Sequence, residues 1–150
     1  MPDDVRVPFW SGATEWAEDR NAVHEALDAV AARGRWILGP EGETFETDLA
    51  CWVAHHRHSH GAVGVASGTD AVMLALRAVG VRDGDEVIVP ALTAVPTVAA
   101  IVGTGAVPVY ADVDPLDAAL DSERAKAAVT SRTRAIVHVH LHGRYGPLPV

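Results

Sequence analysis

The pattern of hydrophobic and polar positions predicts two helices at the start of the chain. Apolar residues recur at helical spacing among acidic residues from Thr14 to Arg33, which is typical of an amphipathic helix, and Gly34 is expected to close it. A second stripe of apolar residues at helical spacing predicts another helix, and its members are Phe45, Leu49, Trp52 and Val53. Cys51 falls on an apolar face of this second helix and is therefore expected in the core.

The rest of the chain alternates short apolar runs with helical stretches. The runs at 62–65, 85–90, 107–111 and 135–140 predict strands, and the stretches at 70–79, 95–102 and 121–129 predict helices. Such alternation favours an open, mainly parallel α/β sheet. The helix after residue 70 has Arg77 as its one charge from 71 to 79, so we expect it to be buried between the sheet and another layer. Turn residues follow the last strand, which predicts that the fold is incomplete in this chain.

Residues 61–76, GAVGVASGTDAVMLAL, predict a strand, a turn of small residues and the start of a helix. The turn contains Ser67, Gly68, Thr69 and Asp70. Free backbone N–H groups and the positive end of a helix dipole suit a phosphate or a carboxylate, which Gly68 would let approach the backbone. Ordinary helix capping by Ser67 or Thr69 explains the same residues. The local pattern leaves both interpretations open.

Composition narrows the class of protein. The 150 residues are enough for one domain, and 49% hydrophobic with 21% charged residues is typical of a globular protein. A net charge of −8 argues against a nucleic-acid-binding protein. A single cysteine permits no internal disulfide, and no apolar run is long enough to span a bilayer. We therefore expect a cytoplasmic protein with neither nucleic-acid nor membrane partners.

Two segments outside the alternating pattern are candidates for binding. Residues 1–13 predict an extended arm, with Phe9 and Trp10 as anchors for a partner. The four histidines within 55–60 invite a metal interpretation, but no cysteine or carboxylate accompanies them at ligand spacing. We interpret that segment as a polar connector and expect no metal site.

Three blocks in this order resemble the DegT/DnrJ family of pyridoxal-phosphate-dependent sugar aminotransferases: GRWILGPEGETFETDLACWV, VGVASGTDAVMLALRAVGVRDGDEVIVPALTAVPTVAAIVGTGAVPVYADVD and SRTRAIVHVHLHG. The resemblance runs from about Pro8 to the end. It implies the large domain of a fold-type-I enzyme over 14–150, with a mainly parallel sheet that is incomplete here, and a homodimer. It further implies pyridoxal 5'-phosphate as cofactor, a nucleotide-linked keto sugar as acceptor and an amino acid, usually glutamate, as donor. The family also contains sugar dehydratases, so the reaction stays open between the two.

The resemblance also implies roles for particular residues. Gly68, Thr69 and Asp70, with Ser67, would hold the cofactor phosphate. Ala94 stands where the family commonly places an aromatic residue against the cofactor ring; an alanine cannot stack, and packing in a core is the alternative. The loop with Trp36 would line the substrate entrance, unless Trp36 is a hydrophobic staple between helices.

His140 resembles a family histidine that follows a strand and could face the substrate crevice. A hydrogen-bonded structural histidine is the alternative that we favour, because no acid or base is paired with it in the sequence. A tyrosine often stands at the position of His142 in the family.

The catalytic groups of such an enzyme are not apparent in this chain. Lys126 is the only lysine, and its surroundings predict an exposed helix position, so we do not expect it to form the Schiff base. The family's lysine and ring-nitrogen aspartate are expected beyond residue 150, and we predict that these 150 residues alone are inactive and poorly stable. The alternative is a non-catalytic α/β module that binds a phosphorylated ligand. A nicotinamide-binding domain is disfavoured because residues 61–68 do not read G-x-G-x-x-G.

Overall fold

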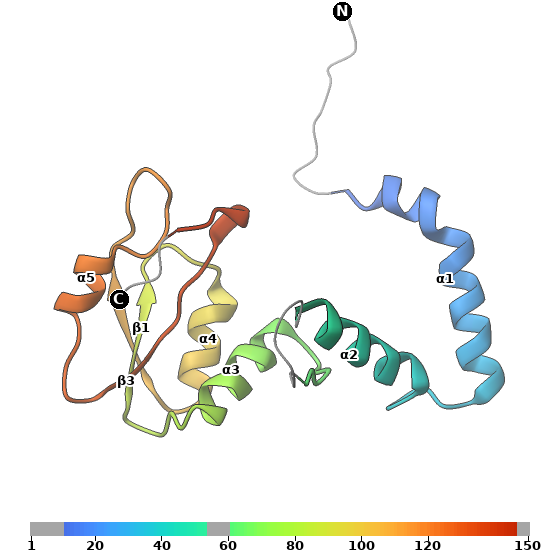
Figure 1. The fold of residues 1–150 in the computed structure, drawn as a ribbon, viewed down its shortest axis with the longest axis horizontal. Coiled ribbons are helices and arrows are strands. Elements are labelled where there is room, and N and C mark those ends of the chain that lie inside the picture. The colour runs from blue at the N-terminus through green and yellow to red at the C-terminus, as the bar shows by residue number, and fades with distance from the viewer. Residues whose placement is uncertain (1–10, 54–60, 147–150) are drawn as a thin grey trace, which may run out of the picture. The chain divides into compact units, whose positions relative to one another are not determined.

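The computed structural model describes residues 11–53 and 61–146 (Figure 1). Contacts divide the chain into two units, Met1–Gly64 and Val65–Val150. The single domain expected from residue 14 onward stays a prediction. Phe9, Trp10 and the histidines of 55–60 lie outside the described residues, so the expectations for the arm and for the polar connector are not addressed.

The first unit contains the two predicted helices, α1 (Ala13–Arg33) and α2 (Pro40–Val53). Gly34 ends α1 as expected, with a left-handed φ of 66° and an N–H that donates to the carbonyls of α1's last turn. No residue of either helix is buried. The expectation that Cys51 lies in a core is wrong, because the described residues of this unit do not cover the apolar face that carries it.

The second unit is an α/β assembly around a three-stranded sheet (Figure 1). Its elements are α3 (Gly68–Ala78), β1 (Glu86–Pro90), α4 (Val95–Gly103), β2 (Val107–Ala111), α5 (Ser122–Ala127), β3 (Thr133–Ile136) and a 3₁₀ turn (Leu141–Gly143). The strand order is β2-β1-β3, and both pairs are parallel. This confirms the predicted parallel α/β sheet.

The central strand β1 is buried along its whole length, as expected for a parallel strand covered on both faces. Successive side chains of β1 alternate between two hydrophobic clusters. One cluster joins the sheet to α3 and α4, and its buried members are Leu76, Val81, Val87, Val89, Ile101 and Ala106. The other joins the sheet to α5, and its buried members are Ile88, Ala111, Leu120 and Ala125. Helices therefore cover both faces of the sheet.

Three details of the second half differ from the sequence predictions. Residues 62–65 are not a strand, since the sheet pairs only β1, β2 and β3 within the described part of the chain. The helix α3 begins at Gly68 and buries only Leu76, because one side of it packs on the sheet and on α4 while its other side is exposed. The strand β3 ends at Ile136, although the Val137 N–H still donates to the Ile88 carbonyl.

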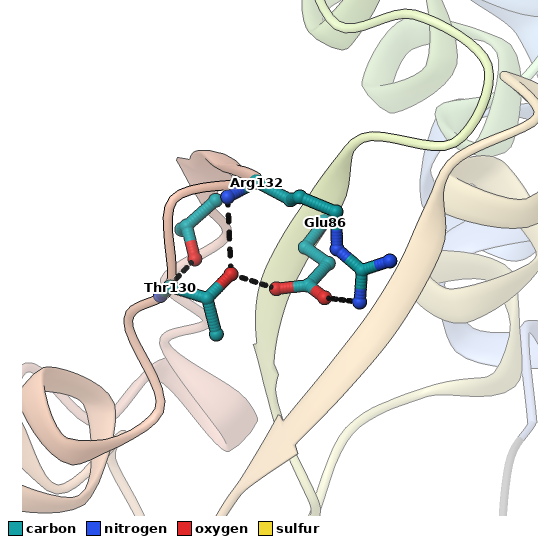
Figure 2. A network of polar contacts seen from close by, with 4 residues as sticks. Glu86, Thr130 and Arg132 are labelled. Carbon is teal, nitrogen blue, oxygen red and sulfur yellow. Dashed lines mark hydrogen bonds and ion pairs between the residues drawn. The ribbon is translucent and has the colours of Figure 1, made fainter.

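A network of polar side chains closes the amino edge of the sheet (Figure 2). The Glu86 carboxylate is buried and accepts a hydrogen bond from the Thr130 hydroxyl at 2.5 Å and another from the Arg132 guanidinium at 2.5 Å. The Thr130 hydroxyl oxygen also accepts the Arg132 N–H at 3.1 Å. The hydrogen bond from Thr130, followed by that from Arg132, lowers the pKa of Glu86 against the opposing effect of burial. The network fixes the start of β1 to the turn before β3.

Among the described helices, none is long and apolar enough to cross a membrane.

Candidate cofactor and substrate site

The residues singled out in the second unit follow the carboxyl ends of the strands or begin a helix. Ala94 follows β1, and His140 follows β3. In open α/β sheets, ligands bind outside the carboxyl ends of the strands, where helix N-termini also gather. The parallel topology therefore assigns the candidate site to the edge opposite the Glu86 network.

The start of α3 is capped by Ser67. This residue has an extended backbone, and its hydroxyl oxygen accepts the Asp70 N–H at 3.1 Å. The same hydroxyl donates to the Asp70 carboxylate at 3.0 Å. The capping interpretation is thus confirmed. The cap uses the N–H of Asp70 and the side chains of Ser67 and Asp70.

Capping leaves other donors at this helix end. In the part of the chain that the structure describes, the N–H groups of Gly68 and Thr69 make no hydrogen bond. A Cβ added to Gly68 would meet no atom within 4 Å, and its φ is not in the left-handed region. The chain's own packing therefore does not require glycine at 68. Two free donors, open space and a positive dipole end are compatible with an anion.

Ala94 is the residue before α4 and has an extended backbone (φ −69°, ψ 142°). It is exposed, so the alternative that placed it in a core is wrong. Beside it, the Thr93 hydroxyl donates to that of Thr97 at 3.1 Å, which ties the loop to the first turn of α4. The backbone at 94 accommodates any side chain, and the methyl group present offers no flat surface for a cofactor ring.

The predicted strand at 135–140 places His140 at its end. In the structure β3 ends at Ile136, and His140 instead precedes the 3₁₀ turn. Its ring stacks on Tyr145, with centroids 4.9 Å apart and an interplanar angle of 23°. It also meets the His138 ring edge to face at 4.7 Å and 71°. Tyr145 and His138 were not predicted from the sequence; histidines at every second position from 138 to 142 were the signal that could have drawn attention to them.

His138 is the least solvated of these rings. Both of its ring nitrogens are shielded from solvent, and neither has a hydrogen-bond partner among residues 11–53 and 61–146. Burial lowers the pKa of His138, and the charge on His140 adds to this effect; the backbone of Gly146 and the Asp117 carboxylate oppose it. The lowered pKa favours the neutral form of His138, whose ring supports that of His140 edge-on.

Trp36 lies in the first unit, in the loop between α1 and α2, and 63% of its surface is exposed. A staple between helices would be packed, so this exposure does not favour the staple alternative. Leu38, two residues later, has a left-handed φ of 52°. The predicted role of Trp36 at a substrate entrance stays a prediction.

Lys126 is an exposed residue of α5, as expected, and its ammonium group pairs with the Glu123 carboxylate at 3.1 Å. The ammonium group of Lys126 is therefore part of an exposed ion pair within α5. No cluster of three or more potential metal ligands occurs within 11–53 and 61–146.

Comparison with known proteins places the chain in a family. Residues 17–150 match the DegT/DnrJ/EryC1/StrS aminotransferase family. The chain is 46% identical over 135 residues to the dTDP-3-amino-3,4,6-trideoxy-alpha-D-glucose transaminase of Micromonospora megalomicea subsp. nigra, covering 90% of this chain and 35% of that protein.

Solved structures agree with this relationship. The structure of S. venezuelae DesV in complex with a ketimine intermediate matches with a TM-score of 0.86 and 40% identity, over 94% of this chain and 37% of that one. Bacillus subtilis NtdA with bound cofactor PMP matches with a TM-score of 0.84 and 32% identity, over 96% and 32% of the two chains. The chain thus spans about a third of the length of these relatives. By sequence and by fold, it belongs to the DegT/DnrJ/EryC1/StrS aminotransferase family.

Proposed function

We propose that this chain forms the cofactor-phosphate site of a pyridoxal-phosphate-dependent nucleotide-sugar aminotransferase. The observation that carries the proposal is the start of α3, where Gly68 and Thr69 present free N–H groups beside open space. NtdA, a structural relative, was solved with bound cofactor PMP, the amino form of this cofactor. The site residues of the proposal are Ser67, Gly68, Thr69 and Asp70 for the phosphate, Ala94 for the ring, and Trp36 and His140 for the substrate.

The residues of α3 would act by binding and orienting the phosphate. The N–H groups of Gly68 and Thr69 would donate to its oxygens, and the dipole of α3 would stabilise its negative charge. The Ser67 hydroxyl already bridges Asp70, which holds the turn in shape before the ligand arrives. When bound, the cofactor supplies an electron sink for amino transfer.

The remaining parts of the proposed activity come from the relatives. A relative that transaminates a dTDP-linked sugar supports a nucleotide-linked keto sugar as acceptor, and an amino acid such as glutamate is the proposed donor. We propose that the enzyme is a cytoplasmic homodimer. The Schiff-base lysine and the ring-nitrogen aspartate are proposed to lie outside these 150 residues; Lys126, the lysine present, is paired with Glu123 on the surface of α5. A sugar dehydratase would use the same phosphate site.

The test uses the full-length protein and the substitution Gly68→Ala. The added Cβ meets no atom of the described residues within 4 Å, so folding should be unaffected, but it would occupy the space needed by the phosphate. We expect the affinity for pyridoxal phosphate to fall about tenfold or more, the worth of one charged hydrogen bond. The affinity for pyridoxal, which has no phosphate, should not change.

Gly42→Ala is the matched control. Gly42 also lies near the start of a helix, and a Cβ added there meets nothing within 4 Å. This variant should bind pyridoxal phosphate like the parent protein. Equal affinities for pyridoxal phosphate in the Gly68→Ala variant and the parent would refute the proposed phosphate site.

A further inference from the structure

The segment after β3 holds an exposed tyrosine in a fixed place. Tyr145 has 78% of its surface exposed, yet both of its neighbours are anchored. The Arg144 guanidinium donates to the Leu116 carbonyl at 3.1 Å. Gly146 is buried against Ala119, at a position where any Cβ would collide with the Ala119 side chain. The backbone on either side of Tyr145 is therefore restrained, although the ring itself is not packed in a core.

The turn that returns the chain over His140 is strained. His142 has a left-handed φ of 56° and ψ of 26°, a conformation that non-glycine residues rarely adopt. The Gly143 N–H donates to the His140 carbonyl, and the Arg144 N–H donates to the Leu141 carbonyl. Strain of this kind persists where the surrounding structure enforces it, and it gathers at functional sites.

The strained turn brings the Tyr145 ring onto the His140 ring, which is supported edge-on by the shielded His138 ring. The rings of His138 and His140 lie in series behind Tyr145 and support one face of its ring. Such a preorganised aromatic surface suits a planar ligand ring, because little freedom is lost when the ligand stacks on it.

We propose that Tyr145, backed by His140, is a stacking platform for the nucleobase of the nucleotide-linked sugar. This inference rests on the proposed function. The reacting sugar carbon must lie in a water-excluded crevice, whereas the nucleotide extends outward from it. His140 and Tyr145 follow the carboxyl end of β3, the edge to which the parallel topology assigns the candidate site, so a base stacked on Tyr145 would lie at that edge. Stacking on an aromatic side chain tolerates different bases, since every base has a π face.

The experiment measures binding of thymidine diphosphate and of pyrophosphate, which has no base, to the full-length protein by calorimetry. Tyr145→Leu should weaken the affinity for thymidine diphosphate between about 5-fold and 100-fold, the range for loss of one base stack. Tyr145→Phe keeps the ring and should retain the affinity. Neither variant should change the affinity for pyrophosphate or for pyridoxal phosphate. Thermal melting of each variant checks that folding is intact.

Tyr110→Leu is the matched control, because Tyr110 is also an exposed tyrosine but lies on β2, and it should bind thymidine diphosphate like the parent protein. Unchanged affinity for thymidine diphosphate in Tyr145→Leu would overturn the platform while leaving the phosphate site of Gly68 intact. Weaker binding of pyridoxal phosphate in Tyr145→Leu would also overturn it, since the ring would then contact the cofactor. If the parent protein bound neither thymidine diphosphate nor pyridoxal phosphate, the proposed function and the platform would be overturned together.

Discussion

The amino and carboxyl edges of the parallel sheet differ in whether their polar groups are hydrogen-bonded within the described chain. At the amino edge, the buried Glu86 carboxylate is engaged by Thr130 and Arg132 (Figure 2). At the carboxyl edge and the start of α3, the N–H groups of Gly68 and Thr69 make no hydrogen bond within the described residues. The Glu86 carboxylate finds its hydrogen-bond partners within the chain, whereas the N–H groups of Gly68 and Thr69 can donate to a ligand.

This difference separates residues that hold the fold from residues that serve binding. A polar group that is buried and fully partnered specifies the geometry of its neighbours. A free donor at a helix end contributes little to folding but interacts strongly with an anion. Substitutions at the amino edge should therefore change stability, and substitutions at the carboxyl edge should change ligand affinity.

The largest expected effect is at the amino edge, in the turn before β2. Gly105 has a left-handed φ of 87°, and a Cβ there would lie 2.3 Å from the Asp83 carboxylate oxygen and 3.2 Å from the Asp83 Cα. Gly105→Ala should lower the free energy of unfolding by about 2–4 kcal/mol, from backbone strain and overpacking together. Urea denaturation of the full-length protein measures this loss. If Gly105→Ala proved as stable as the parent, the amino edge would not be rigid.

A pair of helix caps sharpens the comparison. Ser67 caps α3, and Asp121 caps α5, where its carboxylate accepts the N–H groups of Glu123 at 2.8 Å and Arg124 at 3.0 Å. Ser67→Ala and Asp121→Ala should each lower the free energy of unfolding by about 1 kcal/mol. Only Ser67→Ala should also weaken binding of pyridoxal phosphate, measured by fluorescence titration. Equal cofactor affinity in the two variants would mean that the α3 cap has no part in binding.

The third effect is a dependence of stability on pH from the amino edge. The pKa of Glu86 is lowered in the folded state, so this carboxylate stabilises the fold above its unfolded pKa, and the stabilisation is lost as pH falls through the folded value. Thr130→Val removes the largest cause of the shift and should reduce the stability lost on acidification from about pH 5 downward. Stability curves of Thr130→Val and the parent that stay parallel from pH 6 to pH 3 would contradict this account.

The smallest effect has the same sign, a loss of stability as pH falls, but it comes from a histidine at the carboxyl edge. Burial lowers the pKa of His138, so the unfolded state takes up a proton first as pH falls below about 6.5, and stability is lost between the unfolded and folded pKa values. His138→Phe removes this titration and should flatten the stability curve between pH 7 and pH 5. NMR titration of the His138 ring gives its pKa directly, and a value at or above that of an unfolded histidine would disprove the assignment.

Much of the fold could be predicted from the sequence where the pattern is local. The strand at 107–111 and the helix after residue 95 follow from apolar runs bounded by glycine and proline, and Gly34 closes α1 as its position predicts. The strand predicted from the apolar run at 62–65 is absent from the described structure, because a short run has strand character only if a neighbouring strand pairs with it. Periodicity alone does not reveal which strand that would be.

The site was predictable in part. The turn at Ser67 and Gly68 has a sequence signature, since small residues before a helix are typical of both capping and anion binding. Tyr145 has no such signature. Its stacking on His140 depends on the left-handed turn at His142, a conformation that the residue type does not favour strongly enough to predict.

The pairing of β1 with β3 contains an irregularity: Glu86 is opposite Thr133, whereas Val87 is opposite Ala135, so Arg134 is an additional residue in β3. An extra residue of this kind reverses the direction in which the preceding side chains point. Deleting Arg134 would turn the start of β3 by half a revolution and direct Arg132 away from Glu86. The ion pair at the amino edge therefore depends on the count of residues between 132 and 135 as much as on their identity.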